Sequence, residues 1–345
     1  MAGNELLPVD YRERLSSLSL RAAWGAQIKA IMPLERPAQE TMPHRWRYQE
    51  SRGELLKAGD LVPVEQAERR VLALINPGYG PDQLSATPTI FLGLQLILPG
   101  EWAPNHRHTA AAARVIVEGE GAYTAVNGEK LPMAAGDVIL TPPHYWHEHG
   151  HEGTAPMMWM DVLDTPVVVP AGASYLMRGE RTPHLSNSPD SSETLYRCAG
   201  LIPYRSPKER RPDYPLMRYQ WAKVRDALDA VAQYSAVGEP IHLLYTNPET
   251  GSSALKTFNF SARLIRPGET IEPPVTSASS VMQVFAGRGE SEIDGYIFDW
   301  EEQDTLAVPC FAIARHRNLS STKPAYLLQV DDVPMLEKLG YYEER

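Results

Sequence analysis

Cysteine is scarce in this sequence, which has 2 among its 345 residues. Cys198 and Cys310 cannot build the disulfide framework of a small secreted domain, and their spacing matches no metal site, so we expect a reducing compartment. No apolar run approaches the roughly 18 residues that a membrane span needs. The first dozen residues are charged and lack the apolar stretch of an export signal. These absences predict a cytoplasmic protein that does not enter a membrane.

An excess of basic charge is also missing. Lys and Arg number 33 against 43 Asp and Glu, which gives a formal net charge of −10. A protein that binds nucleic acid needs a basic surface to neutralise phosphates, so this class of partner is excluded. Apolar residues make up 43% of the chain and charged residues 22%, as in globular proteins with a substantial core. At roughly 150 residues per domain, the length predicts about two domains.

Hydrophobic periodicity divides the chain into helical and strand-rich parts. Residues 11–32 repeat apolar side chains near a 3.6-residue period, a shorter helical piece stops at Gly59, and residues 217–234 are typical of one amphipathic helix. The predicted parts are a helical arm (1–80), a strand-rich domain (81–170), a linker with the amphipathic helix (171–240), a second strand-rich domain (241–335) and a C-terminal tail (336–345). We therefore expect a mainly β protein.

The two strand-rich domains have the features of diverged copies of one unit. Gly119-Glu120-Gly121 faces Gly287-Arg288-Gly289. Asn127-Gly128, a strong type I′ hairpin signal, faces Asp294-Gly295 at nearly the same offset. Antiparallel β proteins in general share such turns, but here several landmarks hold one offset over a long stretch. We interpret the pattern as an internal repeat.

Histidine clusters in the first of these domains, where 6 of the 10 histidines lie between residues 106 and 151. Side chains at positions i and i+2 of a β-strand point to the same face, so His106 and His108 can converge on one metal ion. The later segment TPPHYWHEHGH offers a third ligand, because the hairpin between them returns the chain alongside. An isolated pair of this kind is more often a surface strand. The two clusters together predict a site for Zn, Cu, Fe or Ni.

This pattern resembles the two sequence motifs of the cupin family. The ligand positions of those motifs fall on His106, His108 and His147, so the resemblance makes His147 the third ligand. Ala112 stands where the family usually has a glutamate ligand, which implies a three-histidine site and disfavours the oxalate-oxidising cupins. His144 and His151 are expected to be loop residues and not ligands.

The second copy of the unit lacks these ligands. Pro274, Thr276 and Ala314 occupy the matching positions, so we expect a scaffold without metal. His316 matches His149 of the first copy and is expected to be structural. The implied fold is a bicupin, with two β-barrel or jelly-roll cupin domains, an N-terminal helical arm and a linking helix.

Most of the chain resembles the gentisate 1,2-dioxygenase family, which includes salicylate and 1-hydroxy-2-naphthoate dioxygenases. The segments that carry the resemblance are MPHRWRY, AGDLVPV, ERRVLALINPG, LPGEWAPNHRHT, VEGEGAYTAVNG, GDVILTPPHYWHEHGH and WMDVLDTP. The resemblance implies an enzyme with one Fe(II) per chain. Its substrates would be O2 and a small aromatic acid with a hydroxyl ortho to the carboxylate: gentisate, salicylate, a substituted salicylate or 1-hydroxy-2-naphthoate. Cleavage would fall between the carboxylate- and hydroxyl-bearing carbons, and the resemblance suggests a homotetramer.

Other side chains are candidates for this site. Arg114 lies six residues after His108, would share the histidine face of a regular strand, and could clamp a carboxylate in bidentate fashion. Arg70 matches a substrate-pocket arginine of the family, although it also belongs to a charged surface run. His149 is a candidate acid/base, and Asp161 could hold a ligand or Arg114 in place; a surface histidine and a strand-end aspartate are the alternatives. Three alternating residues are expected to shape the pocket, with the glycine leaving room beside the substrate ring: Phe91, Gly93 and Gln95.

Two other classes of function stay open at this point. A non-oxidative metal cupin, such as an isomerase or lyase, would consume no O2 and would tolerate zinc in place of iron. A non-enzymatic cupin that binds or senses a small ligand would show binding without turnover. The ring-cleaving dioxygenase is the interpretation that the combined segments favour.

Overall fold

The computed structural model describes residues 7–38, 40–180, 185, 188–206 and 208–345. The chain divides into two compact units, Met1–Glu40 and Thr41–Arg345. The first unit contains α1 (Val9–Ser17) and α2 (Ala26–Ile31). The helical stretch predicted over residues 11–32 is therefore broken in two. Ser19 and Gly25 have φ angles of 56° and 62°, which an α-helix does not accept.

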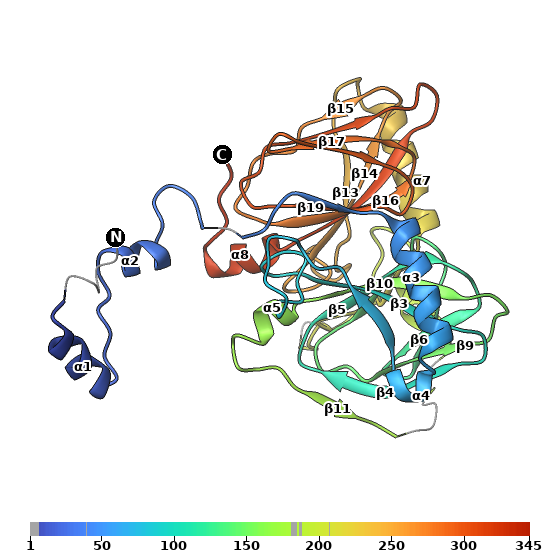
Figure 1. Ribbon diagram of the computed structural model, residues 1–345. Helices are drawn as coiled ribbons and strands as arrows, with labels where there is room; N and C mark the ends of the chain where they lie inside the picture. The colour runs from blue at the N-terminus through green and yellow to red at the C-terminus, as the bar shows by residue number, and fades with distance from the viewer. Residues whose placement is uncertain (1–6, 39, 181–184, 186–187, 207) are drawn as a thin grey trace. The chain divides into compact units, whose positions relative to one another are not determined.

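The first barrel of the larger unit is built from two antiparallel sheets (Figure 1). One has six strands in the order β12-β8-β5-β10-β3-β2, and the other has five in the order β11-β4-β9-β6-β7. The strands are β2 (Arg70–Ala73), β3 (Phe91–Ile97), β4 (Trp102–His108), β5 (Ala112–Glu118), β6 (Ala122–Val126), β7 (Glu129–Pro132), β8 (Val138–Thr141), β9 (His147–His151), β10 (Met157–Leu163), β11 (Leu176–Arg178) and β12 (Arg218–Tyr219).

The second barrel repeats this plan. Its six-stranded sheet has the order β1-β19-β16-β21-β14-β13, and its four-stranded sheet has the order β15-β20-β17-β18. The strands are β1 (His44–Trp46), β13 (Ile241–Leu244), β14 (Asn259–Ile265), β15 (Thr270–Ile271), β16 (Ser280–Ala286), β17 (Gly289–Ile293), β18 (Tyr296–Trp300), β19 (Thr305–Val308), β20 (Ala314–Asn318) and β21 (Ala325–Asp331).

The hairpin turns show the repeat directly. The φ angles are 47° and 85° at Asn127 and Gly128, and 50° and 82° at Asp294 and Gly295. Positive φ at both central residues is what a type I′ turn requires. Each turn joins equivalent strands, β6 to β7 and β17 to β18. The predicted internal repeat and the bicupin fold are therefore confirmed.

Parts of the predicted arm and of the predicted linker form short edge strands of the two barrels. Within the predicted arm, β1 pairs with β19 of the second barrel and β2 pairs with β3 of the first. Within the predicted linker, β11 pairs with β4 and β12 pairs with β8. Strands of two to four residues are too short for an alternating pattern to stand out in the sequence. Residues from 41 onward therefore belong to the barrel unit and not to an arm that ends at residue 80.

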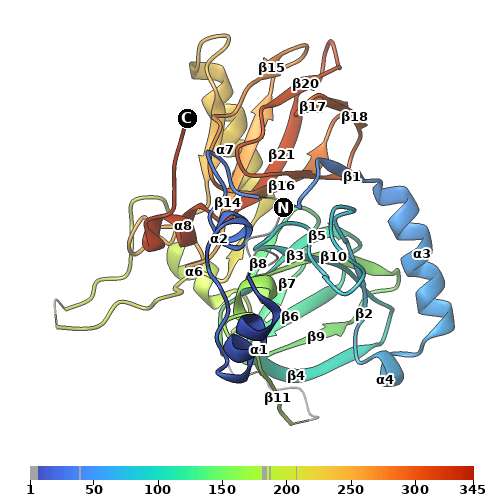
Figure 2. The same ribbon diagram turned by 60° about the vertical axis from the view of Figure 1, so that its left-hand side comes forward.

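Helices cover parts of the barrels. They are α3 (Tyr48–Leu61), α4 (Val64–Ala67), α5 (Thr165–Val168), α6 (Ser191–Tyr196), α7 (Trp221–Tyr234) and α8 (Val333–Leu339). The predicted amphipathic helix is confirmed as α7, which buries Leu228 and lies beside the second barrel (Figure 2). The prediction that a helix stops at Gly59 was wrong, because α3 continues through this residue to Leu61. A Cβ at Gly59 would lie 2.9 Å from Cδ2 of Leu96, so the glycine allows the helix to approach β3 closely.

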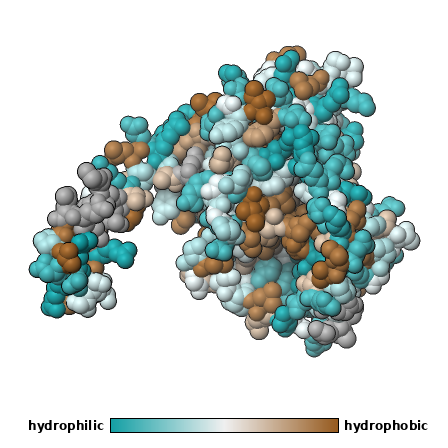
Figure 3. Space-filling view, in the orientation of Figure 1, coloured by the Kyte–Doolittle hydropathy of each residue, from teal (hydrophilic) through white to brown (hydrophobic). Residues whose placement is uncertain are grey.

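The main core lies between the six-stranded sheets of the two barrels. Buried side chains of one sheet, such as Leu92 and Leu94, belong to one cluster with Phe260 and Leu328 of the other. Because strand residues alternate, this packing turns the intervening residues of β3 toward the interior of the first barrel. Hydrophobic side chains also gather on the surface near the junction of the barrels (Figure 3). Among the described helices, none has the length and apolar character needed to cross a membrane.

Candidate metal centre and its surroundings

Two neighbouring strands bring the predicted metal ligands together. His106 on β4 pairs directly with His147 on β9, and His108 follows on the same face of β4. One potential ligand atom from each of the three histidines lies within 4.8 Å of the others. Ring centroids are 4.0 Å apart for His106 and His147, and 4.8 Å apart for His108 and His147. The fold therefore brings together His106 and His108, which the spacing predicted, and His147, which the cupin resemblance implied as the third ligand.

Burial keeps these imidazoles neutral, which is the form that binds metals. Desolvation lowers the pKa of His108 to about 4 and lowers the pKa of His147 well below its ordinary value of 6.5. Nδ1 of His108 donates to the carbonyl oxygen of Ala110, and Nδ1 of His147 to that of Tyr145, both at 2.9 Å. These bonds keep the proton on Nδ1 and leave a lone pair on Nε2. Nε2 of His147 is buried without a hydrogen-bond partner in the described part of the chain, which fits a bound cation.

The third imidazole contacts an arginine that the sequence analysis did not single out. Nη2 of Arg69 donates to Nδ1 of His106 at 2.6 Å and to the carbonyl oxygen of Pro104 at 2.9 Å. A guanidinium only donates, so Nδ1 of His106 accepts here and the proton of the neutral ring lies on Nε2. Burial lowers the pKa of His106, and the charge of Arg69 adds to the shift. For His106 to ligate a cation through Nε2, its proton must move to Nδ1 and Arg69 must turn away.

Arg70, the residue suggested by the family resemblance, points to the opposite side of β2. Its guanidinium is buried in an ion pair with Glu101. Val71 pairs with Gln95 across the sheet, so Arg69 shares the Gln95 side of the strand and Arg70 does not. Alternation distinguishes the two arginines only when the phase of this four-residue strand is known. The sequence carried no signal for that phase.

Arg114 is buried on β5, where Asp161 of β10 is its direct cross-strand neighbour. Nε of Arg114 lies 3.5 Å from Oδ1 of Asp161, and its Nη1 donates to Oγ1 of Thr141. Nε1 of Trp159 donates to the same carboxylate at 3.0 Å. Burial lowers the pKa of Arg114 to about 10 and raises the pKa of Asp161 to about 6, while their mutual attraction opposes both shifts. At neutral pH both groups are mainly charged, and the carboxylate fixes the position of the guanidinium.

His149 lies two residues beyond His147 on β9, on the same face. Its Nδ1 is 2.9 Å from Oγ1 of Thr124, and its ring centroid is 5.2 Å from that of Trp159. Nε2 is buried and has no hydrogen-bond partner among the residues described. Burial, reinforced by the charge of Arg114, lowers the pKa of His149 well below 6.5. The fold therefore places a fourth neutral imidazole on the ligand side of this strand.

The three residues expected to shape the pocket lie on the inner face of β3. Gln95 is buried there. A Cβ at Gly93 would lie 2.5 Å from Cγ1 of Val71 and 2.9 Å from Cε1 of Phe91. The space over Gly93 is thus filled by the chain's own side chains and is not left open beside a substrate ring. The glycine acts by letting the Phe91 ring approach the backbone.

The remaining histidines of the cluster make local contacts. Nε2 of His151 donates to the carbonyl oxygen of Ala155 at 2.6 Å, and its Nδ1 accepts from the backbone of Gly153 at 3.1 Å. His144 has a φ angle of 67°, and its Nδ1 lies 3.3 Å from the hydroxyl of Tyr175. Neither belongs to the converging group of ligands.

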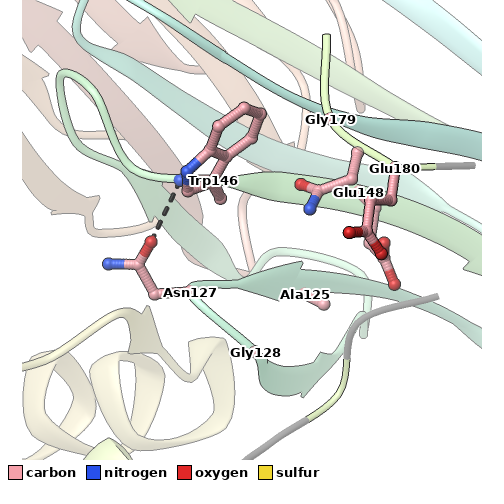
Figure 4. Close-up of a pocket in the computed structure, with 8 residues that line it drawn as sticks. Ala125, Asn127, Gly128, Trp146, Glu148, Gly179 and Glu180 are labelled. Carbon is pink, nitrogen blue, oxygen red and sulfur yellow. Dashed lines mark hydrogen bonds between the residues drawn. The ribbon is translucent and has the colours of Figure 1, made fainter. Parts of the chain in front are cut away.

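A hollow lies on the outer face of the five-stranded sheet, behind the ligands. Glu148 sits between His147 and His149 on β9, so strand alternation turns it away from them. Figure 4 shows its side chain on the wall of this hollow together with those of Trp146 and Glu180. The volume is about 460 Å³, and none of the three ligands lines it. This hollow is therefore separate from the metal centre.

Known proteins match the chain over nearly its whole length. A family model described as "Cupin domain" matches residues 93–163. The chain is 45% identical to a gentisate 1,2-dioxygenase of Ralstonia sp, over 99% of this chain and 95% of the relative. It is 36% identical to a 5-aminosalicylate 1,2-dioxygenase of Comamonas sp, over 88% of this chain and 81% of that relative. A salicylate 1,2-dioxygenase from Pseudoaminobacter salicylatoxidans, solved as adducts with gentisate, matches with a TM-score of 0.90 at 28% identity, covering 100% of this chain and 96% of that one.

The fold and the site together define a bicupin metalloenzyme in which one barrel carries a three-histidine centre. The relatives narrow this class, because they match the chain over both barrels and are named 1,2-dioxygenases. The chain belongs to the gentisate/salicylate 1,2-dioxygenase family. The family predicted from the sequence segments is therefore confirmed, and the isomerase, lyase and non-enzymatic interpretations are set aside.

Proposed function

We propose that this enzyme opens the ring of a small aromatic acid that has a hydroxyl ortho to its carboxylate. The bond cleaved is the one between the carboxylate-bearing and hydroxyl-bearing carbons. Both oxygen atoms of O2 enter the product, so the reaction needs no external reductant. The observation that carries this proposal is the convergence of His106, His108 and His147 beside two cations, the half-buried Arg69 and the buried Arg114.

The cofactor we propose is one Fe(II) per chain, held by the three histidines. Three neutral imidazoles leave the charge of a divalent ion uncompensated and leave coordination positions open, which suits an anionic chelating substrate. When bound, ferrous iron supplies the redox chemistry that couples a singlet aromatic ring to triplet O2. The unpartnered Nε2 of His147 supports a cation at this point.

Two arginines are the proposed anchors of the substrate carboxylate. Arg114 is buried and Arg69 is half-buried, and the charge of Asp161 acts on both. Glu68 also acts on Arg69, where the charge of Arg178 opposes it. Two cations beside the ligands, with one carboxylate shared between them, favour an anionic ligand. When His106 takes up its ligating tautomer, Arg69 loses its acceptor on that ring and is free to donate to the substrate. Arg114 keeps its position through Asp161 and Thr141.

His149 is the proposed acid/base near the reacting oxygens. Its neutral state leaves one nitrogen to bond the Thr124 hydroxyl and the other to face the reacting groups. Asp161 acts as a positioning residue through Arg114. Phe91, Gly93 and Gln95 would form the wall against which the ring rests. Arg70 supports the fold through Glu101, and we assign it no contact with the substrate.

The preferred substrate belongs to the gentisate and salicylate class. The chain is similar in sequence to relatives named for gentisate, 5-aminosalicylate and 1-hydroxy-2-naphthoate. The first of these, at 45% identity, makes gentisate the substrate to test before the others.

Oxygen consumption tests this function directly. The apoprotein is reconstituted with Fe(II) under anaerobic conditions and mixed with gentisate, salicylate, 5-aminosalicylate or 1-hydroxy-2-naphthoate in aerated buffer. We expect one mole of O2 to be taken up for each mole of ring-opened product, which is detected by its new absorbance. Zinc-loaded protein is the matched control and should take up no O2. The proposal is overturned if iron-loaded protein takes up none with any of these acids.

Assembly as a homotetramer is a second proposal. It is supported by large apolar side chains that remain exposed on the barrel unit, among them Leu61 at 74% and Leu84 at 52% exposed. Light scattering after size-exclusion chromatography should give a mass about four times that of the chain, and a monomer mass would contradict the proposal.

A further inference from the structure

The second barrel encloses a cavity at the place equivalent to the metal centre. Its volume is about 240 Å³. Pro274, Thr276 and Ala314, which stand at the positions of the three metal ligands, all line it. The repeat has therefore lost the metal ligands without filling the space they surrounded. An apolar cavity of about 150 Å³ is large enough for a benzene molecule, so this one has room for a single ring with a polar substituent.

A guanidinium lies in this cavity without an ion pair. Arg263 is 8% exposed and lines the cavity from β14. Its Nε donates to Oε1 of Gln329 at 3.3 Å. Asp331 attracts it, but no carboxylate in the described part of the chain lies within ion-pair distance of Arg263, and the bond from Nε to Gln329 is its one hydrogen bond among the described residues. A buried cation left in this way requires an anion or ordered water as partner.

Other polar atoms around the cavity also lack partners. Nδ1 of His316 is 2.7 Å from Oγ of Ser291, just as Nδ1 of His149 bonds Thr124 in the first barrel. The other ring nitrogen of His316, Nε2, is buried and has no hydrogen-bond partner among the residues described. The structural role expected for His316 therefore accounts for only one of its two ring nitrogens. Oδ1 of Asn259, which also lines the cavity, has none either. The polar part of the cavity lining thus combines the cation of Arg263 with unpartnered atoms of His316 and Asn259.

Another part of the lining is apolar. It is formed by prolines and small apolar side chains: Pro273, Pro274, Val308, Pro309 and Ala312. Tyr342 closes one side, and the backbone of the C-terminal residues pairs with residues 275–277 at this edge. A ligand with one charged end and one apolar end matches a cavity divided in this way.

We propose that the second barrel is a binding site for a small carboxylate with an apolar body the size of one aromatic ring. Arg263 would take the carboxylate, His316 would add a hydrogen bond, and the proline wall would contact the apolar body. The charge balance supports this choice. The pKa of Arg263 falls only to about 10 through burial, so it remains a cation. Burial raises the pKa of Asp331 to about 7, so this carboxyl is partly neutral and does not cancel the charge. The proposed site needs no metal and does not depend on the ring-cleavage chemistry of the first barrel.

Binding of 4-fluorobenzoate, followed by 19F NMR on the full-length iron-loaded protein under anaerobic conditions, tests the proposal. This probe lacks the ortho hydroxyl, so it cannot form the hydroxyl–carboxylate chelate proposed for the substrate. We expect Arg263→Gln to weaken binding about 10- to 100-fold, the effect of losing one charge-assisted hydrogen bond. The matched control is Arg315→Gln, because Arg315 lies on β20 of the same barrel in an exposed ion pair with Glu272 and should leave binding unchanged.

Two further variants show in which barrel the probe binds and control for misfolding of Arg263→Gln. Ala314→Phe fills the cavity while Arg263 remains, so it should also abolish this binding. Arg114→Leu removes the proposed carboxylate anchor of the first barrel and should leave it intact. Equal affinity in wild type, Arg263→Gln and Ala314→Phe would overturn the proposal. Loss of binding in Arg114→Leu alone would place the probe in the first barrel and would equally overturn it. Crystals soaked with 4-bromobenzoate should show bromine scattering inside the second barrel.

Discussion

Replacing Arg114 with Met tests whether the buried guanidinium serves the substrate or the fold. The methionine side chain fills similar space without charge, so the main change is the loss of the cation 3.5 Å from Asp161. Removing one partner of a buried ion pair costs about 3–5 kcal/mol when the other partner stays charged. The pKa of Asp161 is already about 6 with the guanidinium present. The carboxylate can therefore take up a proton, which limits the loss of unfolding free energy to about 1–3 kcal/mol near neutral pH.

This loss of stability should grow as the pH rises. The pKa of Asp161 is higher in the folded state, about 6, than its ordinary value of 3.8. The folded protein then binds more protons than the unfolded one between these values, and stability falls as the pH rises through that window. Without Arg114 the window extends upward, since the cation no longer lowers the pKa. Urea unfolding should show a smaller difference between wild type and Arg114→Met at about pH 5 than at about pH 8.

Activity separates the two roles of Arg114. Loss of a charge-assisted contact to the substrate carboxylate should lower kcat/KM about 10- to 100-fold, mainly through KM. Adding Asp161→Asn to Arg114→Met removes the orphaned acid and should restore stability without restoring KM. Arg52→Met is the matched control, since Arg52 forms a partly exposed pair with Glu118 and should change neither quantity much. Unchanged kcat/KM in Arg114→Met, or recovery of KM in the double variant, would refute the assignment.

Three further predictions follow from individual contacts. Gly93→Ala introduces a Cβ 2.5 Å from Val71 and should lower the unfolding free energy by about 1–3 kcal/mol, measured by urea denaturation; unchanged stability would contradict the close packing. Thr124→Val removes the hydroxyl that bonds His149 and should lower kcat about tenfold with iron content unchanged; loss of iron would show a role in metal binding instead. Arg69→Gln should raise KM about 10- to 100-fold while iron binding is retained or improved, and an unchanged KM would contradict its role as an anchor.

Part of the metal centre was predictable because its signal is local in the sequence. Two histidines spaced by two residues share a strand face, which singled out His106 and His108. His147 came from the resemblance to the cupin motifs, and the fold places it opposite His106 by pairing β9 with β4. Arg114 was chosen by counting along one regular strand from His108, and that premise was wrong, because β4 ends at His108 and Arg114 lies on β5 of the other sheet. The guanidinium is nevertheless close enough to lower the pKa of His108. The prediction of His106 and His108 depends only on strand periodicity, which a short segment determines.

The choice between Arg69 and Arg70 could not be made in that way. Adjacent strand residues face opposite sides, and the phase of β2 is set by its pairing with β3 and not by its own residues. The edge strands β1, β11 and β12 were missed for the same reason, because partners distant in sequence create them. The neutral tautomers of the histidines likewise depend on carbonyls and on a guanidinium that only the folded chain brings close.

X-ray absorption at the iron edge of the Fe(II)-loaded protein, recorded anaerobically without and with salicylate, tests the metal centre most directly. We expect one iron per chain with scattering from three imidazoles, and replacement of solvent oxygens by substrate oxygens when salicylate is added. An iron bound by fewer than three imidazoles, or a spectrum that salicylate leaves unchanged, would contradict the proposed site.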